Sequence, residues 1–159
     1  LDILILALFF SMRIISGHFI GDIAISFWLF AFSIFIFLSL ASLKRFTELK
    51  NLHPSLANQI PGRGYIDVDA SILFLIGIIS GLLSTFTIIL YFNSKEIMSM
   101  YKNPIFLWSS LPILIYWILR IFLLGNRGII NEDPVKFIIK DKTSFFIALL
   151  LLGLVILAK

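Results

Sequence analysis

The chain has 159 residues, of which 60% are hydrophobic and only 14% are charged, whereas soluble domains are roughly 45–50% apolar and about 25% charged. This composition excludes an ordinary soluble domain, and the absence of cysteine excludes disulfide bonds and thiolate metal sites. The net charge of +4 is small and dispersed, so we expect no nucleic-acid partner.

A helix needs about 20 mostly apolar residues to cross a bilayer. Five stretches meet or nearly meet this length, and they cover residues 3–20, 23–43, 71–92, 104–124 and 143–158. The sequence therefore predicts an all-α, polytopic membrane helix bundle of about five transmembrane helices, forming a single domain over residues 1–159. Because the chain starts inside an apolar run, we expect it to be a fragment of a longer protein.

Basic residues are concentrated in alternate connections of this predicted bundle. One side carries eight of them: Lys44, Arg45, Lys50, Arg63, Arg127, Lys136, Lys140 and Lys142. The opposite side carries three: Lys95, Lys102 and Lys159. Because cytoplasmic loops of membrane proteins are enriched in Lys and Arg, the first side is predicted to be cytoplasmic. We expect a multi-pass protein of the inner (plasma) membrane whose active face is cytoplasmic.

The connection before the last predicted helix has a helical pattern of its own. Asp133 precedes Pro134, a capping residue followed by proline at the first helical position. Apolar residues within 135–139 would give this segment one apolar edge. We therefore predict a short helix along the membrane surface, with Asp141 or Thr143 capping the last helix.

Lys44 and Glu48 are four residues apart, so they lie on one face if the second helix continues past the membrane boundary. Two interpretations remain open. The pair is an exposed ion pair worth roughly 0.3–0.5 kcal/mol, or it belongs to a binding site. In that site Lys44 and Arg45 would grip phosphate oxygens, and Glu48 would hold a divalent cation or its waters.

The loop that follows contains PGRGYIDVDAS, residues 61–71. Its glycines permit a tight backbone path that frees amide groups for an anion. Asp67 and Asp69 are carboxylates near a basic cluster, a combination that suits a polyphosphate bridged by Mg²⁺. The alternative is a solvated loop whose aspartates cap the third helix.

Two arginines lie within apolar stretches, where an arginine at mid-membrane costs about 2.5–3.5 kcal/mol to insert. Arg120 is near the cytoplasmic end of the fourth helix, so its side chain can reach the interface. Arg13, in the first helix, is predicted to face a wet cavity or the carbonyl groups of a neighbouring helix. Pro112 predicts a kink in the fourth helix, which would open space for a lipid chain or repack the bundle.

The order of several motifs along the chain resembles a known family. The motifs are MRIISG, FWLFAFSIFIFLSLASLKRFTEL, GRGY, YKNPIFLWSSLPILIYWILRIFLLGNRG and EDPVKFIIKDKTS. Together they resemble the C-terminal half of a UbiA-type prenyltransferase, closest to the decaprenyl-phosphate phosphoribosyltransferase branch. The resemblance covers nearly the whole chain. It implies nine membrane helices around a cavity open to the cytoplasm and lipid, with the last five supplied by this chain.

The resemblance also implies a magnesium-dependent transferase that acts on a polyprenyl (di)phosphate lipid and a phosphorylated small-molecule co-substrate. Such enzymes hold Mg²⁺ and a diphosphate between two polar motifs. The second motif is aspartate-rich in most members, but the matching segment here contains Lys44, Arg45 and Glu48. The lysine favours phosphoribosyl over prenyl transfer. The first motif has no counterpart here, so the missing N-terminal half of the protein would have to supply it, and the fragment alone should be inactive.

The residue patterns and the resemblance together predict three groups of site residues. The catalytic residues are Lys44, Arg45 and Glu48. The substrate-binding residues are Arg13, Arg63, Tyr65 and Arg120. The metal ligands are Glu48, Asp67 and Asp69, with Mg²⁺ as the cofactor. A different class remains open, namely a non-catalytic membrane bundle such as a transporter half or an assembly subunit.

Overall fold

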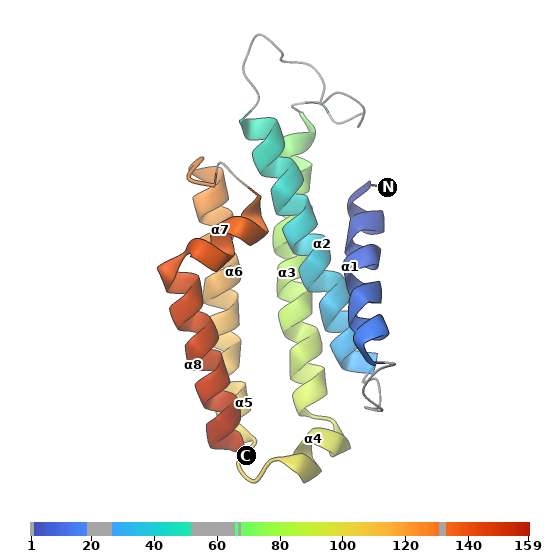
Figure 1. Cartoon of the computed structure of the whole chain (residues 1–159), viewed down its shortest axis with the longest axis vertical. Coiled ribbons are helices and arrows are strands. Elements are labelled where there is room, and N and C mark those ends of the chain that lie inside the picture. The colour runs from blue at the N-terminus through green and yellow to red at the C-terminus, as the bar shows by residue number, and fades with distance from the viewer. Residues whose placement is uncertain (1, 19–26, 52–65, 67, 131–132) are drawn as a thin grey trace.

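The structure is a computed structural model of the chain, and it describes residues 2–18, 27–51, 66, 68–130 and 133–159. Side chains are described for these residues except 13–18 and 96. The elements are α1 (Asp2–His18), α2 (Phe27–Lys50), α3 (Asp69–Phe92), α4 (Lys95–Met100), α5 (Ile105–Trp108), α6 (Ser110–Asn126), α7 (Pro134–Lys140) and α8 (Lys142–Ala158). Every element in the described residues is a helix, which confirms the all-α prediction (Figure 1).

Within the described residues, three helices are long and apolar enough to cross a membrane: α2, α3 and the 22-residue stretch Ile105–Asn126. The α7–α8 pair could form a fourth span, bent by 75°. The five spans predicted from the sequence included α1 and α8, which have only 17 residues each. The structure therefore supports a helical membrane bundle with three or four of the five predicted spans.

α2 continues beyond the predicted membrane-spanning stretch, which is the condition under which Lys44 and Glu48 share one face. It continues past residue 43 to Lys50, so the apolar run and the charged run that follows it form one continuous helix. Lys44, Arg45 and Glu48 consequently lie on a rigid element, and helical geometry fixes the directions in which they point.

Small residues allow α3 to pack closely against its neighbours. A Cβ atom added at Gly77 would lie 2.5 Å from the ring of Phe122, and one at Gly81 would lie 2.7 Å from Ile118 Cγ2. Ser39 of α2 donates a hydrogen bond of 2.7 Å to the Gly77 carbonyl. Membrane helices associate through such small residues because lipid surroundings give them no hydrophobic driving force. The spacing of Gly77 and Gly81 thus sets how closely α2, α3 and α6 approach.

The main buried core lies between these three helices. Its fully buried members include Leu43, Ile121, Phe122 and Ile130. Phe74 joins the helices through ring contacts, with centroids 4.9 Å from Phe46 and 5.6 Å from Phe122. The core therefore continues up to the level of the charged residues on α2.

Pro112 lies in the first turn of α6, and the helix is interrupted at Ser109. Because proline has no N–H, it cannot donate to the carbonyl four residues earlier, at Trp108. The predicted irregularity therefore appears as a break at the start of α6, and α5 and α6 still make up one candidate span.

The predicted short helix before α8 is confirmed as α7. Asp133 accepts a hydrogen bond of 3.0 Å from the Val135 N–H, and Pro134 takes the first helical position. Asp141 caps α8 by accepting a bond of 2.8 Å from the Ser144 N–H. The two aspartates thus bracket α7.

α7, the start of α1 and the C-terminal ends of α2 and α6 lie at one end of the bundle (Figure 1). We call this the α7 end. The opposite end holds α4, the start of α5 and the chain's last residue. Most of the basic residues are carried by elements at the α7 end, in agreement with the alternation predicted from the sequence.

Candidate functional site

Arg45 is almost fully buried and holds two carboxylates. Its side chain is only 3% exposed. Nε donates to Asp2 at 2.6 Å, and Nη1 donates to Glu48 at 2.5 Å. Asp2 belongs to the first turn of α1, so this ion pair joins α1 to α2. Leaving a buried charge unpaired costs about 3–5 kcal/mol, so these contacts explain how Arg45 is tolerated there.

Lys44 points to a different neighbour. Its ammonium donates to Asp133 Oδ2, in the segment just before α7. The sequence suggested Glu48 as the partner of Lys44, whereas the structure pairs Lys44 with Asp133 and Glu48 with Arg45. The Lys44 side chain is 38% exposed and that of Asp133 is 26% exposed.

The ionisation of Asp133 depends on this contact. Burial alone would raise the pKa of its carboxyl group, but the hydrogen bonds from Lys44 and from the Val135 N–H, with the nearby positive charge, lower it below its ordinary value. Asp133 is therefore negatively charged at neutral pH, and its charge offsets that of Lys44.

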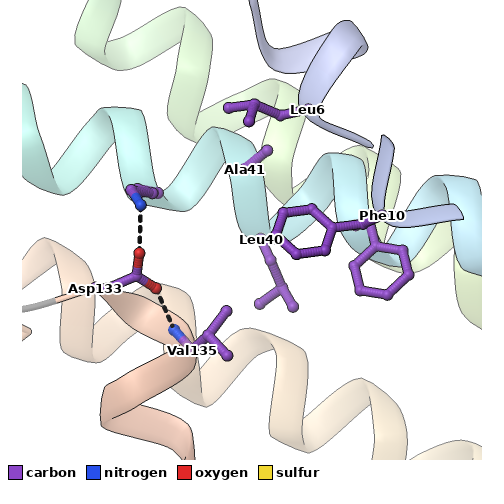
Figure 2. A pocket seen from close by; sticks show the side chains of 8 residues that line it. Leu6, Phe10, Leu40, Ala41, Asp133 and Val135 are labelled. Carbon is purple, nitrogen blue, oxygen red and sulfur yellow. Dashed lines mark hydrogen bonds and ion pairs between the residues drawn. The ribbon is translucent and has the colours of Figure 1, made fainter. Parts of the chain in front are cut away.

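An apolar groove with a volume of about 220 Å³ begins at this ion pair (Figure 2). Its apolar lining comes from α1, α2 and α7, and consists of Leu6, Phe10, Phe37, Leu40, Ala41 and Val135. The rings of Phe10 and Phe37 are stacked, with centroids 5.3 Å apart. Lys44 and Asp133 are its charged lining residues within the described part of the chain. The groove is thus amphiphilic, with hydrocarbon along its walls and an ion pair at one end.

A second ion pair fastens α6 to the start of α8. Arg120 donates two hydrogen bonds to Asp141, of 2.6 and 3.1 Å. Asp141 also accepts from the Ser144 hydroxyl at 2.7 Å, and Trp117 Nε1 donates to that hydroxyl at 3.1 Å. The hydrogen bond from Arg120, helped by Ser144, outweighs burial and lowers the pKa of Asp141 to about 2. Arg120 does not line the groove, so the structure gives it a helix-joining contact.

Several predicted site residues lie outside what the structure describes, namely Arg63, Tyr65 and Asp67. Arg13 lies on α1, but its side chain is also outside the described set. Asp69 begins α3, and its carboxylate accepts a hydrogen bond of 3.0 Å from the Ile66 N–H. Asp69 therefore closes the turn into α3, whereas the N-cap position is Val68 and no side chain caps the helix there.

The metal prediction can be compared with the described carboxylates. In the part of the chain that the structure describes, no group of three or more His, Asp and Glu side chains could hold a metal ion. Glu48 is bonded to Arg45, and Asp69 to a backbone amide. The described residues do not by themselves fit a Mg²⁺ site, so the cofactor stays a prediction that requires ligands from other residues.

The sequence analysis did not predict that Asp2, Asp133 and Asp141 form ion pairs. Asp133 and Asp141 were predicted as helix caps only, and Asp2 was not singled out. Each lies within or beside an apolar segment, where a charged side chain needs a partner. That requirement was the available signal, but it did not identify which cation would be the partner.

Two curated proteins are similar to the chain over 99% of its length, and each is 32% identical to it. One is the uncharacterized protein y4nM of Sinorhizobium fredii, and the other is the nodulation protein NoeC of Azorhizobium caulinodans. The chain spans 31% of the first protein and 52% of the second. No family profile matches the chain, and no solved structure matches it.

Proposed function

We propose that the chain is part of a membrane-embedded transferase of the UbiA type that acts on a polyprenyl phosphate or diphosphate lipid. The observation that carries the proposal is the amphiphilic groove, in which six apolar side chains lead to the ammonium of Lys44. A matching ligand has a hydrocarbon part and an anionic head. A polyprenyl phosphate has this chemistry.

The charge distribution supports a cytoplasmic position for the α7 end, because Lys and Arg are enriched in cytoplasmic loops. Both similar proteins are from bacteria, so the proposed location is the inner (plasma) membrane. A soluble phosphorylated co-substrate would then reach the α7 end directly from the cytoplasm.

In this proposal the chain's own residues bind and orient the lipid. Lys44 contacts the head-group phosphate and orients it as the acceptor, while the electron pair of the broken bond leaves with the diphosphate of the co-substrate. Arg45 and Asp2 hold α1 against α2 and so keep the groove walls in place. Mg²⁺, when bound, would neutralise part of the charge of a diphosphate. Holding the lipid head and the co-substrate together supplies the remaining gain, which is positional.

Lys44 also bears on the type of transfer. Most members of the family that the chain resembles have a metal-binding carboxylate where this chain has Lys44. We therefore favour phosphoribosyl transfer over prenylation of an aromatic acceptor. Glu48, Asp67 and Asp69 would then orient metal, water or a sugar hydroxyl together with the residues upstream of this chain.

Membranes from cells that express the full-length protein test the proposal. Incubated with radiolabelled phosphoribosyl diphosphate and a polyprenyl phosphate, they should form a labelled lipid, while membranes lacking the protein should not. Saturable solute uptake into vesicles without a labelled lipid, from this donor or from a prenyl diphosphate, would contradict the transferase and favour a transporter half.

A further inference from the structure

The charge at the end of the groove is balanced inside the protein. Lys44 supplies the cation and Asp133 the anion, and hydrogen bonding from Lys44 keeps this carboxylate ionised. A phosphate that approaches Lys44 therefore meets a neutral pair and a carboxylate that already accepts from the ammonium. The resting arrangement opposes the binding of the anion that the groove otherwise suits.

The ion pair between Lys44 and Asp133 is weak enough for Lys44 to exchange one anionic partner for another. Both side chains are partly exposed, at 38% and 26%, and exposed ion pairs contribute only about 0.2–1 kcal/mol. Asp133 precedes a short helix, so a change in its position need not disturb α2. The other end of α7 is held separately, through Asp141 and the two hydrogen bonds from Arg120. The ion pair at the start of α7 is thus weaker than the one at its end, while the neighbouring Pro134 is fully buried. The Asp133 side chain can therefore change partner without release of the helix.

The size of the groove indicates which part of a lipid it takes. Pockets that enclose a drug-sized ligand have volumes of about 300–1,000 Å³, whereas this groove has about 220 Å³. It therefore accommodates the chain segment next to a head group and leaves the rest of the chain in the bilayer. Val135 of α7 lines it beside Asp133, so the helix that Asp133 caps also forms part of the wall.

We propose that Asp133 is an internal competitor for the lipid phosphate: it holds Lys44 until the head group of a phosphorylated isoprenoid lipid, whose chain enters the groove, displaces it. This inference rests on the proposed function for its ligand class. It adds a residue with no place in the predicted site and gives the Asp133 side chain the role of a latch on Lys44.

Equilibrium binding of radiolabelled farnesyl phosphate to the detergent-solubilised full-length protein tests the latch. Asp133→Asn removes the competing charge but keeps a good helix cap. Its Kd for farnesyl phosphate should be about two- to fivefold lower than that of the wild type, the range that an exposed ion pair accounts for. Glu96→Gln, on α4 at the opposite end, makes the same change in net charge and should leave the Kd unchanged.

A second pair of variants asks whether Asp133 acts through Lys44. Lys44→Gln should weaken binding, and adding Asp133→Asn to it should produce no further tightening. Farnesol, which lacks the phosphate, should bind wild type and Asp133→Asn alike, and inorganic phosphate should bind both far more weakly than farnesyl phosphate. Unchanged or weaker farnesyl phosphate binding by Asp133→Asn would overturn the proposal. So would inorganic phosphate binding as tightly as farnesyl phosphate.

The binding assay needs no turnover, so it separates the latch from the reaction. A labelled product together with an unchanged Kd in Asp133→Asn would refute the latch and leave the transferase standing. Tighter binding in Asp133→Asn, with no product from any variant, would refute the transferase and leave a phosphorylated-lipid site.

Discussion

The two ends of α7 carry the same kind of contact, a capping aspartate paired with a cation from another helix, yet the contacts differ in strength. Asp141 receives two hydrogen bonds from Arg120, and both side chains are largely buried, at 19% and 13% exposed. Asp133 pairs with the more exposed Lys44 through one oxygen, beside a groove. The planar guanidinium suits two parallel bonds to a carboxylate, whereas an ammonium acts as a point charge that exchanges partners easily.

Because the two contacts differ in strength, the Arg120–Asp141 and Lys44–Asp133 pairs have different roles. The Arg120 contact fixes the angle between α7 and α8, where the chain bends by 75°. The Lys44 contact stabilises the fold little and controls the charge at the groove. Three measurements would break or sharpen this comparison.

The largest effect is expected for Lys44→Gln. Product formation by the full-length protein should fall about 100-fold, because the acceptor phosphate is no longer held in the reacting position. The free energy of unfolding should change by about 1 kcal/mol or less, because both side chains of the pair are partly exposed. Product formation is followed with radiolabelled lipid, and unfolding by denaturant titration in micelles.

Lys50→Gln is the matched control for Lys44→Gln. Lys50 lies on the same helix end but donates to the Asn126 carbonyl and, at 2.8 Å, to Asn126 Oδ1. The Lys50→Gln variant should retain most of the product formation of the wild type. An equal loss of product in both variants would show that net charge, rather than the position of Lys44, matters.

A smaller effect, on stability, is expected for Arg120→Gln. The substitution leaves Asp141 poorly compensated, so the free energy of unfolding should fall by about 2–3 kcal/mol. Adding Asp141→Asn should recover part of that loss, since the unpaired charge disappears while the cap is kept. If Arg120→Gln costs no more than Lys44→Gln in the same titration, the two ends of α7 are equivalent and the comparison fails.

The smallest effect is the acid sensitivity of the Asp141 end. Its folded-state pKa of about 2 lies below the ordinary value of 3.8, so the contact contributes stability above the ordinary value. That contribution is lost as the pH falls through the folded value. The free energy of unfolding should therefore decrease between about pH 4 and pH 2 more steeply in wild type than in Asp141→Asn. Parallel curves for the two proteins would contradict the assigned pairing.

The sequence predicted most of the helices because long apolar runs and capping residues are local signals. Asp133–Pro134 and Asp141 marked the ends of α7 correctly for this reason. The apolar stretch that ends at residue 43 marked only the membrane span, and whether α2 continued past it was left open. Hydropathy changes at the membrane boundary, but a helix can continue beyond it, as α2 does to Lys50.

The candidate site was less predictable because its contacts join residues far apart in the chain. Lys44 and Asp133 are separated by 89 residues, and Arg45 and Asp2 by 43. Local spacing suggested Glu48 as the partner of Lys44, although Arg45, three residues before Glu48, takes that carboxylate. A lipid cavity was expected from the resemblance, but the residues that line the groove could not be predicted, since the lining requires α1, α2 and α7 to meet.

The glycines of α3 have a consequence for how the sequence can vary. At Gly81, the space for a methyl group is taken by Ile118 Cγ2 at 2.7 Å and Ser39 Oγ at 3.0 Å, from two different helices. An alanine there is compatible with the fold only alongside a smaller residue at position 118. Substitutions at positions 81 and 118 should therefore occur together. Genetic selection for suppressors of Gly81→Ala should return changes at Ile118 on α6.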